Sequence, residues 1–214
     1  MDYSKPTLIV ISGPNGAGKS THIQIMLPLA FQGIWSFDRD KVRVEFEKIL
    51  LEQAVNENDL FRQATAMMEQ KLLQEMKKAL KIKDHFVLET PLSHPDYWAY
   101  IDLFEKNGYQ LQLNYLCLDN VNDCIARVEQ RVIEGGHYVE PSTIKGVYDK
   151  NLEHINAYKD TFGVIELYDG MAIPELLARI ENDTVTFAEK NALKKIWIRK
   201  GLPSLIVAIQ AYLK

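Results

Sequence analysis

A glycine-rich segment at residues 13–21 (GPNGAGKST) constrains this chain more than any other part of its sequence. It fits the template G-x-x-x-x-G-K-[ST], with Lys19 and Ser20 in the last two positions. An apolar run precedes it at residues 8–11, and a stretch with helical periodicity follows. This order of strand, glycine-rich turn and helix predicts a phosphate-binding P-loop.

The chemistry of the segment explains the prediction. Glycines allow the backbone to wrap closely around a phosphate, and the loop N–H groups and the positive end of the next helix point at negative charge. We expect Lys19 to reach the β- and γ-phosphates of ATP or GTP and Ser20 to bind Mg²⁺. The alternative is a turn that binds nothing. The predicted nucleotide-binding residues are Gly13, Pro14, Asn15, Gly16, Ala17, Gly18, Lys19, Ser20 and Thr21.

Strand-like and helical patterns alternate along the chain. We expect strands at 7–12, 33–37, 85–88, 109–118 and 164–168, and helices at 19–29, 41–83 (broken at 56–59 and capped there by Asn58 or Asp59), 91–106, 120–134 and 141–159. This alternation predicts an α/β fold, a P-loop NTPase with a doubly wound parallel five-stranded sheet flanked by helices. Ligands then bind at the carboxyl ends of the strands.

The last part of the chain follows a different pattern. Residues 174–214 suggest two or three amphipathic helices, with a break at 201–203. We therefore expect residues 1–170 to form the P-loop domain and residues 171–214 a helical C-terminal extension packed on it.

Composition and net charge argue against some classes of protein. The chain has 214 residues and a net charge of −4, which argues against a general nucleic-acid binder. Cys117 and Cys124 form no C-x-x-C pair, and no signal peptide or membrane-spanning stretch is apparent, so we expect a cytoplasmic protein without nucleic-acid or membrane partners.

Carboxylates and hydroxyls follow two of the predicted strands. Asp38 and Asp40 come after the second strand, and Glu89, Thr90 and Ser93 after the third. Asp40 could accept a proton from a substrate hydroxyl, and Glu89 could hold Mg²⁺ through water or bind substrate. Thr90 and Ser93 could donate to a sugar or phosphate. The alternative is that these acids cap a helix or a strand end.

Two arginines lie four residues apart on one predicted helix. Arg127 and Arg131 therefore share a face, and residues 135–137 (GGH) follow as a lid would require. Such arginine pairs can clamp a transferring phosphate. Charge pattern alone favours a solvated face paired with Asp123 or Glu134.

Several separated stretches together resemble one family, the zeta-toxin-like P-loop kinases, including variants described as predicted ABC-type ATPases. The matching stretches are ISGPNGAGKST (11–21), FDRD (37–40), FVLETPLS (86–93), GY (108–109), RVEQRV (127–132), GGH (135–137), YDKNL (148–152) and YD (168–169). The resemblance covers about residues 7–170 and does not extend to the C-terminal segment.

The resemblance implies a kinase that uses ATP or GTP and Mg²⁺ to phosphorylate the 3′-hydroxyl of the sugar in UDP-N-acetylglucosamine. By position it implies that Asp40 is the base, that Glu89 and Thr90 lie beside the substrate, and that Arg127 and Arg131 clamp the phosphate. It also implies a toxin, for which we expect any inhibitor to be a separate antitoxin chain or the C-terminal segment.

One departure from the family pattern concerns the segment before Tyr148. Relatives tend to carry arginines there, whereas this chain has Lys145 and Gly146. Lys145 can supply a point charge to the substrate but no guanidinium fork. Two other functions stay open: a kinase for a nucleoside, nucleotide or antibiotic, and a nucleotide-dependent switch ATPase. The absence of an LSGGQ signature disfavours an ABC-type ATPase.

Overall fold

The computed structural model describes residues 1–53, 56–136 and 138–214. Its elements in chain order are β1 (Thr7–Ser12), α1 (Lys19–Met26), η1 (Leu29–Phe31), β2 (Phe37–Asp38), α2 (Arg39–Glu52), α3 (Glu57–Ile82), β3 (Phe86–Glu89), α4 (Pro95–Lys106), β4 (Gln110–Cys117), α5 (Val121–Ile133), α6 (Pro141–Tyr158), η2 (Lys159–Thr161), β5 (Val164–Asp169), β6 (Glu175–Glu181), β7 (Thr184–Ala188), η3 (Lys190–Lys194), α7 (Ile196–Gly201) and α8 (Pro203–Tyr212).

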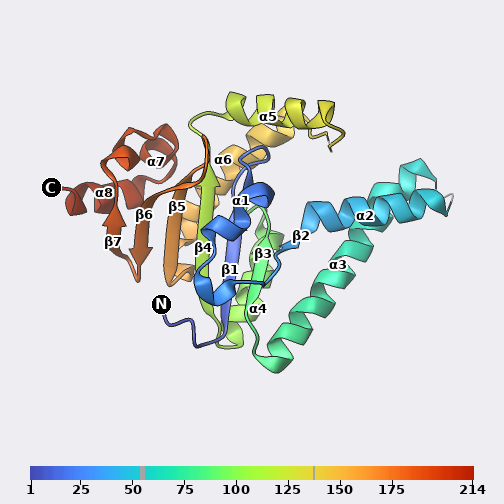
Figure 1. Ribbon diagram of the computed structural model, residues 1–214, viewed down its shortest axis with the longest axis horizontal. Coiled ribbons are helices and arrows are strands. Elements are labelled where there is room, and N and C mark those ends of the chain that lie inside the picture. Colours follow the sequence, from blue (N-terminus) through green and yellow to red (C-terminus); the bar gives the residue numbers. More distant parts are fainter. Residues whose placement is uncertain (54–55, 137) are drawn as a thin grey trace.

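The described strands form one sheet in the order β2-β3-β1-β4-β5-β6-β7. β2, β3, β1, β4 and β5 are parallel, as the alternating pattern predicts, and β6 and β7 are antiparallel. Figure 1 shows the carboxyl ends of the parallel strands at one end of the sheet, with α5 lying across that end. The α/β fold is confirmed, but the sheet has seven strands instead of five.

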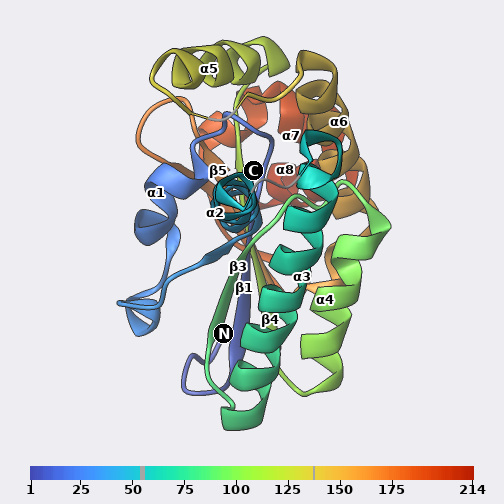
Figure 2. The same cartoon turned by 90° about the vertical axis from the view of Figure 1, so that its right-hand side faces the viewer.

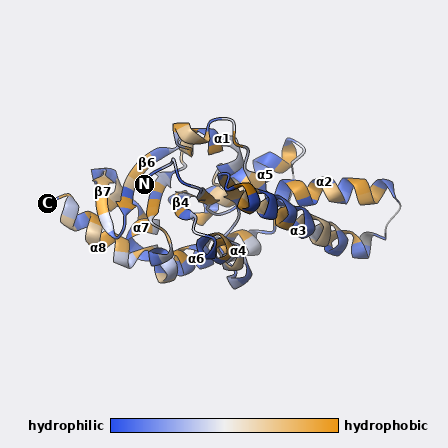
Figure 3. Ribbon diagram, turned by 90° about the horizontal axis from the view of Figure 1, so that it is seen from below, coloured by the Kyte–Doolittle hydropathy of each residue, from blue (hydrophilic) through white to orange (hydrophobic). Residues whose placement is uncertain are grey.

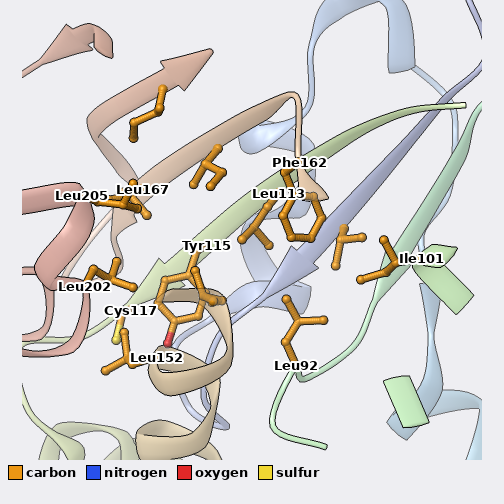
Figure 4. Packing of buried hydrophobic residues seen from close by; sticks show 14 of the residues in the cluster. Leu92, Ile101, Leu113, Tyr115, Cys117, Leu152, Phe162, Leu167, Leu202 and Leu205 are labelled. Atoms are coloured by element: carbon orange, nitrogen blue, oxygen red, sulfur yellow. The ribbon is translucent and has the colours of Figure 1, made fainter. Parts of the chain in front are cut away.

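The two faces of the sheet are covered unequally. Along β1, Leu8 and Val10 belong to a large apolar cluster that includes side chains of α3, α4, α6 and α8. Ile9 and Ile11 belong to a smaller cluster with α1 and η1. Figure 4 shows the large cluster, in which Leu113 and Tyr115 of β4 lie among residues of β5, α6 and the C-terminal segment. Side chains of a strand point alternately to the two faces, and both faces of this sheet are covered, which explains why the middle of β1, residues 8–11, is apolar throughout.

The expected helical extension is wrong in its first half. Residues 175–188 form the hairpin of β6 and β7, and only η3, α7 and α8 after it are helical. Good helix formers such as Leu, Ala, Glu and Arg occupy β6, but pairing with the edge of β5 overrides that propensity. Asn182 and Asp183 make the turn with φ of 46° and 62°, and an Asn-Asp pair between apolar runs was an available hairpin signal.

Several expected boundaries also differ. α1 ends at Met26 instead of residue 29, because the residue before Pro28 disfavours helical geometry. β2 begins only at Phe37, after Gly33 with φ of 85° and the exposed Trp35. The helical stretch expected at 41–83 becomes α2 and α3, with Asn56 as the cap instead of Asn58 or Asp59; residues 54 and 55 lie outside the described part.

α2 and α3 form a long helical pair beside the sheet. Figure 2 shows α3 running next to α4, and Figure 3 shows hydrophobic and hydrophilic residues alternating along both α2 and α3. Met68, Leu72 and Met76 form the buried stripe of α3 at helical spacing. This packing fixes the direction of α2, whose first turn reaches the carboxyl end of the sheet. Within the described residues, no helix is both long enough and apolar enough to cross a bilayer.

The C-terminal segment contributes directly to the core, which gives a stability prediction. Trp197 is 2% exposed and its ring centroid lies 5.6 Å from that of Tyr115 on β4. We expect Trp197→Ala to lower the free energy of unfolding by about 3–5 kcal/mol, because it leaves a cavity. Trp35→Ala, at a site 84% exposed, is the matched control and should change it by less than about 0.5 kcal/mol. Urea unfolding measures both; equal effects would mean that the C-terminal segment is not part of the cooperative core.

Candidate active site

The P-loop approaches its neighbours at backbone distance. A Cβ at Gly13 (φ 150°) would lie 2.0 Å from the Leu116 carbonyl oxygen of β4, and one at Gly16 (φ 84°) would lie 2.3 Å from the Cys124 carbonyl oxygen of α5. No side chain fits at either position, and the conformations themselves disfavour one. The loop is therefore held between the end of β4 and the first turns of α5.

The start of α1 is arranged to receive an anion. Its N-cap is Gly18, which has no side chain to bond the first N–H groups, and no acidic residue lies in the first turn. These N–H groups thus carry the positive end of the helix without a competing carboxylate. The Lys19 Nζ donates to the Gly13 and Pro14 carbonyls at 2.9 and 3.1 Å, so the ammonium lies over the loop.

Three oxygen-bearing side chains meet beside the loop. The Ser20 hydroxyl lies 2.8 Å from Glu89 Oε1 and 3.1 Å from Asp38 Oδ2. Asp38 Oδ1 also accepts from the Lys41 N–H at 3.0 Å, which makes Asp38 the N-cap of α2. The capping alternative therefore holds for Asp38, while its second oxygen faces Ser20.

Glu89 is the most perturbed acid in this group. Burial raises the pKa of Glu89 to about 7; the charge of Lys19 opposes this rise, and the negative charges of Asp38 and Asp40 add to it. Glu89 is only 7% exposed, and its Oε2 is buried with no hydrogen-bond partner among the described residues. A cation bound beside such a carboxyl would stabilise its charged form.

The residues present fit a magnesium ion. Ser20, Asp38 and Glu89 offer more oxygen acceptors than the single serine proton can satisfy, and oxygen is the ligand that Mg²⁺ prefers. In the described chain, no group of three or more His, Cys, Asp or Glu could hold a metal alone. A usual Mg²⁺ site needs only one or two protein oxygens, together with phosphate and water.

A pocket of about 590 Å³ joins the loop to the first turns of α2. Its lining comprises Asn15, Gly16, Gly18, Lys19, Ser20, Thr21, His22, Asp38, Asp40, Lys41, Val44, Glu45, Lys48, Glu89, Arg127, Arg131, Glu134 and Val139. Asp40 is exposed to it, and no hydrogen bond to its carboxylate occurs among the described residues. Asp40 is thus the carboxylate left available to a ligand, whereas Asp38 is engaged.

Sequence reasoning missed the α2 wall of this pocket. The pocket side of the helix carries Lys41, Glu45 and Lys48. The first two are four residues apart and the last two three residues apart. That spacing was a readable signal, because such residues share one helix face. His22 of α1 was missed too, and nothing in the sequence distinguished it.

The two arginines reach the pocket from α5. Arg127 Nη1 donates to the Gly170 carbonyl at 2.8 Å and Nη2 to the Met171 carbonyl at 2.7 Å. These bonds replace the expected pairing with Asp123 or Glu134, and they leave other guanidinium N–H groups for a ligand. Arg127 Nη1 also lies 3.9 Å from the position of a Cβ on Gly18, so it is close to the loop.

The glycines after α5 have a local role. The Gly136 N–H bonds to the Arg131 carbonyl at 2.8 Å and the Gly135 N–H to the Val132 carbonyl at 3.0 Å, with Gly135 at φ 86°. This is a Schellman cap, which ends the helix in a fixed geometry. The expected lid also includes His137, which lies outside the described residues.

Three predicted substrate residues do not line the pocket. Thr90 is buried, its N–H bonds to the Ile11 carbonyl at 3.2 Å, and its hydroxyl bonds to the Pro91 carbonyl at 3.2 Å. Ser93 is half-buried in the loop before α4, and Lys145 is exposed on α6. Their roles toward a substrate stay predictions.

Phosphoryl transfer requires cations and N–H groups around a phosphate and a carboxylate opposite it, and this pocket brings both together. The fold and the glycine-rich loop place the chain in the P-loop class, and its pocket has the groups that a nucleotide-binding phosphotransferase requires. The sequence model of the zeta toxin family matches residues 1–187, so the chain belongs to that family and the resemblance is confirmed.

Similar proteins are found both by sequence and by structure. A protein of Haemophilus influenzae is 26% identical over 140 residues, which cover 65% of this chain and 91% of the relative. A structure of the PezAT toxin–antitoxin system of Streptococcus pneumoniae matches with TM-score 0.61 and 20% identity over 96% of this chain and 87% of the other.

A crystal structure of AvrRxo1-ORF1 with AvrRxo1-ORF2 and ATP matches with TM-score 0.65 and 14% identity over 90% of this chain. The chain spans 63% of the length of that matched protein. At such identities the structural similarities establish the fold alone.

The raised pKa of Glu89 gives a prediction for stability against pH. Between its ordinary pKa of 4.5 and about 7, the folded protein holds a proton that the unfolded chain has lost. Stability from this group therefore falls as pH rises through that window, by on the order of 3 kcal/mol. We expect Glu89→Gln to remove this fall and to be more stable than wild type at pH 8 without metal.

Urea unfolding from pH 5 to pH 8 measures the effect, and Glu45→Gln on the exposed pocket wall is the control. Parallel stability curves for Glu89→Gln and wild type would contradict a buried, proton-holding Glu89.

Proposed function

We propose that this chain transfers the γ-phosphate of ATP or GTP to a sugar hydroxyl of a UDP-N-acetylhexosamine, with UDP-N-acetylglucosamine as the acceptor that the family suggests. The observation that carries the proposal is the placement of Asp40, unbonded and exposed, in the same pocket as the P-loop and its lysine. A base beside a phosphate cradle is the arrangement that phosphorylation of a hydroxyl needs.

The donor half of the site rests on the loop. Its N–H groups and Lys19 bind the phosphates. Ser20 and Glu89 would hold Mg²⁺, which would supply positive charge to the phosphates. Asp38 has two tasks in this proposal: it caps α2 through Oδ1 and hydrogen-bonds Ser20 through Oδ2.

The acceptor half rests on α2. Asp40 takes the proton of the attacking hydroxyl, and Lys41 and Lys48 on the same wall favour an acceptor that carries phosphates, such as the diphosphate of a UDP-sugar. Thr90, Ser93 and Lys145 do not line the pocket, so the proposal assigns them no contact with the acceptor.

The cationic side of the pocket completes the proposal. Arg127 and Arg131 clamp the transferring phosphoryl group from α5, opposite the carboxylates. In the matched PezAT structure the toxin belongs to a toxin–antitoxin system. By analogy we propose that a separate antitoxin chain controls this protein.

The direct test is incubation of the protein with labelled ATP, Mg²⁺ and a panel of UDP-sugars, nucleosides and aminoglycosides, read by mass spectrometry. A UDP-N-acetylhexosamine that gains one phosphate supports the proposal. Phosphorylation of a nucleoside or an antibiotic instead would identify a different kinase. Tight ATP binding without any phosphorylated acceptor would indicate a nucleotide-dependent switch.

Lys19→Ala should abolish the reaction at the donor. Loss of one cation that stabilises the transferring phosphate costs on the order of 100-fold or more in rate. The turnover of labelled ATP measures this effect, with Lys78→Ala on α3 as a control lysine outside the pocket. An unchanged rate in Lys19→Ala would refute the role given to the loop.

Asp40→Asn should separate catalysis from nucleotide binding. A general base typically contributes at least about 100-fold, so we expect kcat to fall by that order while the ATP dissociation constant changes by less than about twofold. Asp38→Asn keeps the N-cap, because Asn caps helices as well as Asp. If Asp38→Asn slows transfer and Asp40→Asn does not, the base is Asp38 and not Asp40.

A further inference from the structure

A buried lysine lies behind the site, in a segment that the family match does not reach. Lys195 follows η3 and precedes α7, eight residues beyond the matched region 1–187. It is 7% exposed, and its Nζ lies 2.5 Å from Asp169 Oδ2 and 3.2 Å from Asp119 Oδ2. One cation thus joins two carboxylates from separate strand ends.

The surroundings keep Lys195 charged. Burial alone would lower the pKa of Lys195, but the hydrogen bonds to Asp169 and Asp119 outweigh it and leave the pKa raised. The neighbouring Trp197 and Ile198 are core residues, so the backbone that carries the lysine is anchored. Burying a charge costs free energy of desolvation, which only well-placed partners of opposite charge can offset.

The first partner controls the turn that holds Arg127. Asp169 ends β5; its Oδ2 binds Lys195 and its Oδ1 accepts from the Met171 N–H at 3.2 Å. The next peptide is also fixed, because the Gly170 N–H bonds to the Cys117 carbonyl at 2.9 Å. The carbonyls of Gly170 and Met171 are the two acceptors of the Arg127 guanidinium.

The second partner controls the helix that carries Arg127. Asp119 lies between β4 and α5, directly before Asn120, whose side chain caps α5 by accepting from the Asp123 N–H at 3.1 Å. Lys195 therefore contacts both the segment just before α5, the helix that carries the Arg127 guanidinium, and the turn at residues 169–171, which binds it.

The turn also touches the loop. A Cβ on Gly170 would lie 2.8 Å from the Ala17 carbonyl oxygen, so a displacement of residues 169–171 would reach the phosphate cradle. Small displacements of groups that position a transferring phosphate lower the rate of transfer strongly.

We propose that Lys195 is a positioning residue for Arg127, acting through Asp169 and Asp119 to hold the guanidinium in place over the P-loop. Lys195 itself does not line the pocket. The proposal rests on the proposed function only for its effect on rate; the position of Arg127 can be measured without any reaction.

The first test reads the guanidinium directly. Arginine-selective ¹⁵N NMR of the full-length protein should show resolved Nη signals of Arg127, assigned from their absence in Arg127→Lys, because bonds to two carbonyls slow rotation of the group. We expect Lys195→Met to remove these signals, Lys195→Arg to restore them, and Lys194→Met, at the exposed neighbour, to leave them unchanged. Unchanged Arg127 signals in Lys195→Met would overturn the proposal.

The second test reads the rate. We expect Lys195→Met to lower kcat about tenfold and to change the KM for ATP less than about threefold, since Lys19 and the loop N–H groups stay in place. Combined with Arg127→Ala, it should add less than about a twofold further loss, because both changes remove one clamp. Multiplicative losses would mean that Lys195 acts independently of Arg127 and would overturn the proposal.

Two controls keep these outcomes separate. If Lys195→Met does not fold, Asp169→Asn, which retains the Oδ1 acceptor for Met171, replaces it and should show the same loss of Arg127 signals. If the wild type transfers no phosphate to any acceptor, the proposed function fails, and the NMR comparison still decides the role of Lys195.

Discussion

The close contact of the P-loop backbone with β4 and α5 is the constraint on which the rest of the site depends. Gly13 and Gly16 approach carbonyl oxygens at distances that exclude any Cβ, so the cradle is part of the packing of the domain. Because the same α5 carries Arg127 and Arg131, the loop and the arginines keep a fixed relation. Ser20, one residue into α1, then sets where Asp38 and Glu89 can meet it.

Much of this architecture could be predicted from the sequence. The P-loop, the five parallel strands and the acids at the strand ends followed from local patterns, because a buried parallel strand and a glycine-rich turn each carry a strong signal. The C-terminal hairpin could not be predicted from propensity, since β6 is rich in helix formers and becomes a strand only by pairing with β5. The contacts of Arg127 with Gly170 and Met171 were also beyond reach, because they join segments more than forty residues apart.

The site itself shows the same division. Asp38 and Asp40 were both candidates, and only the hydrogen bonds of Asp38 to Lys41 and Ser20 separate their roles. Burial of Glu89 depends on the whole sheet, so neither its raised pKa nor its orphaned oxygen could be inferred from the LETPLS stretch. Residue identity suggested which side chains could act, whereas packing determines which of them are engaged in hydrogen bonds.

The added hairpin has a consequence for how the sheet meets its surroundings. Without β6 and β7, the buried strand β5 would present an open edge of N–H and carbonyl groups to other chains. The edges are instead β2, only two residues long, and β7, where the Tyr212 hydroxyl from α8 donates to the Thr186 carbonyl at 3.2 Å. The hairpin therefore moves the open edge of the sheet from the buried β5 to β7, where α8 engages one of the outward carbonyls.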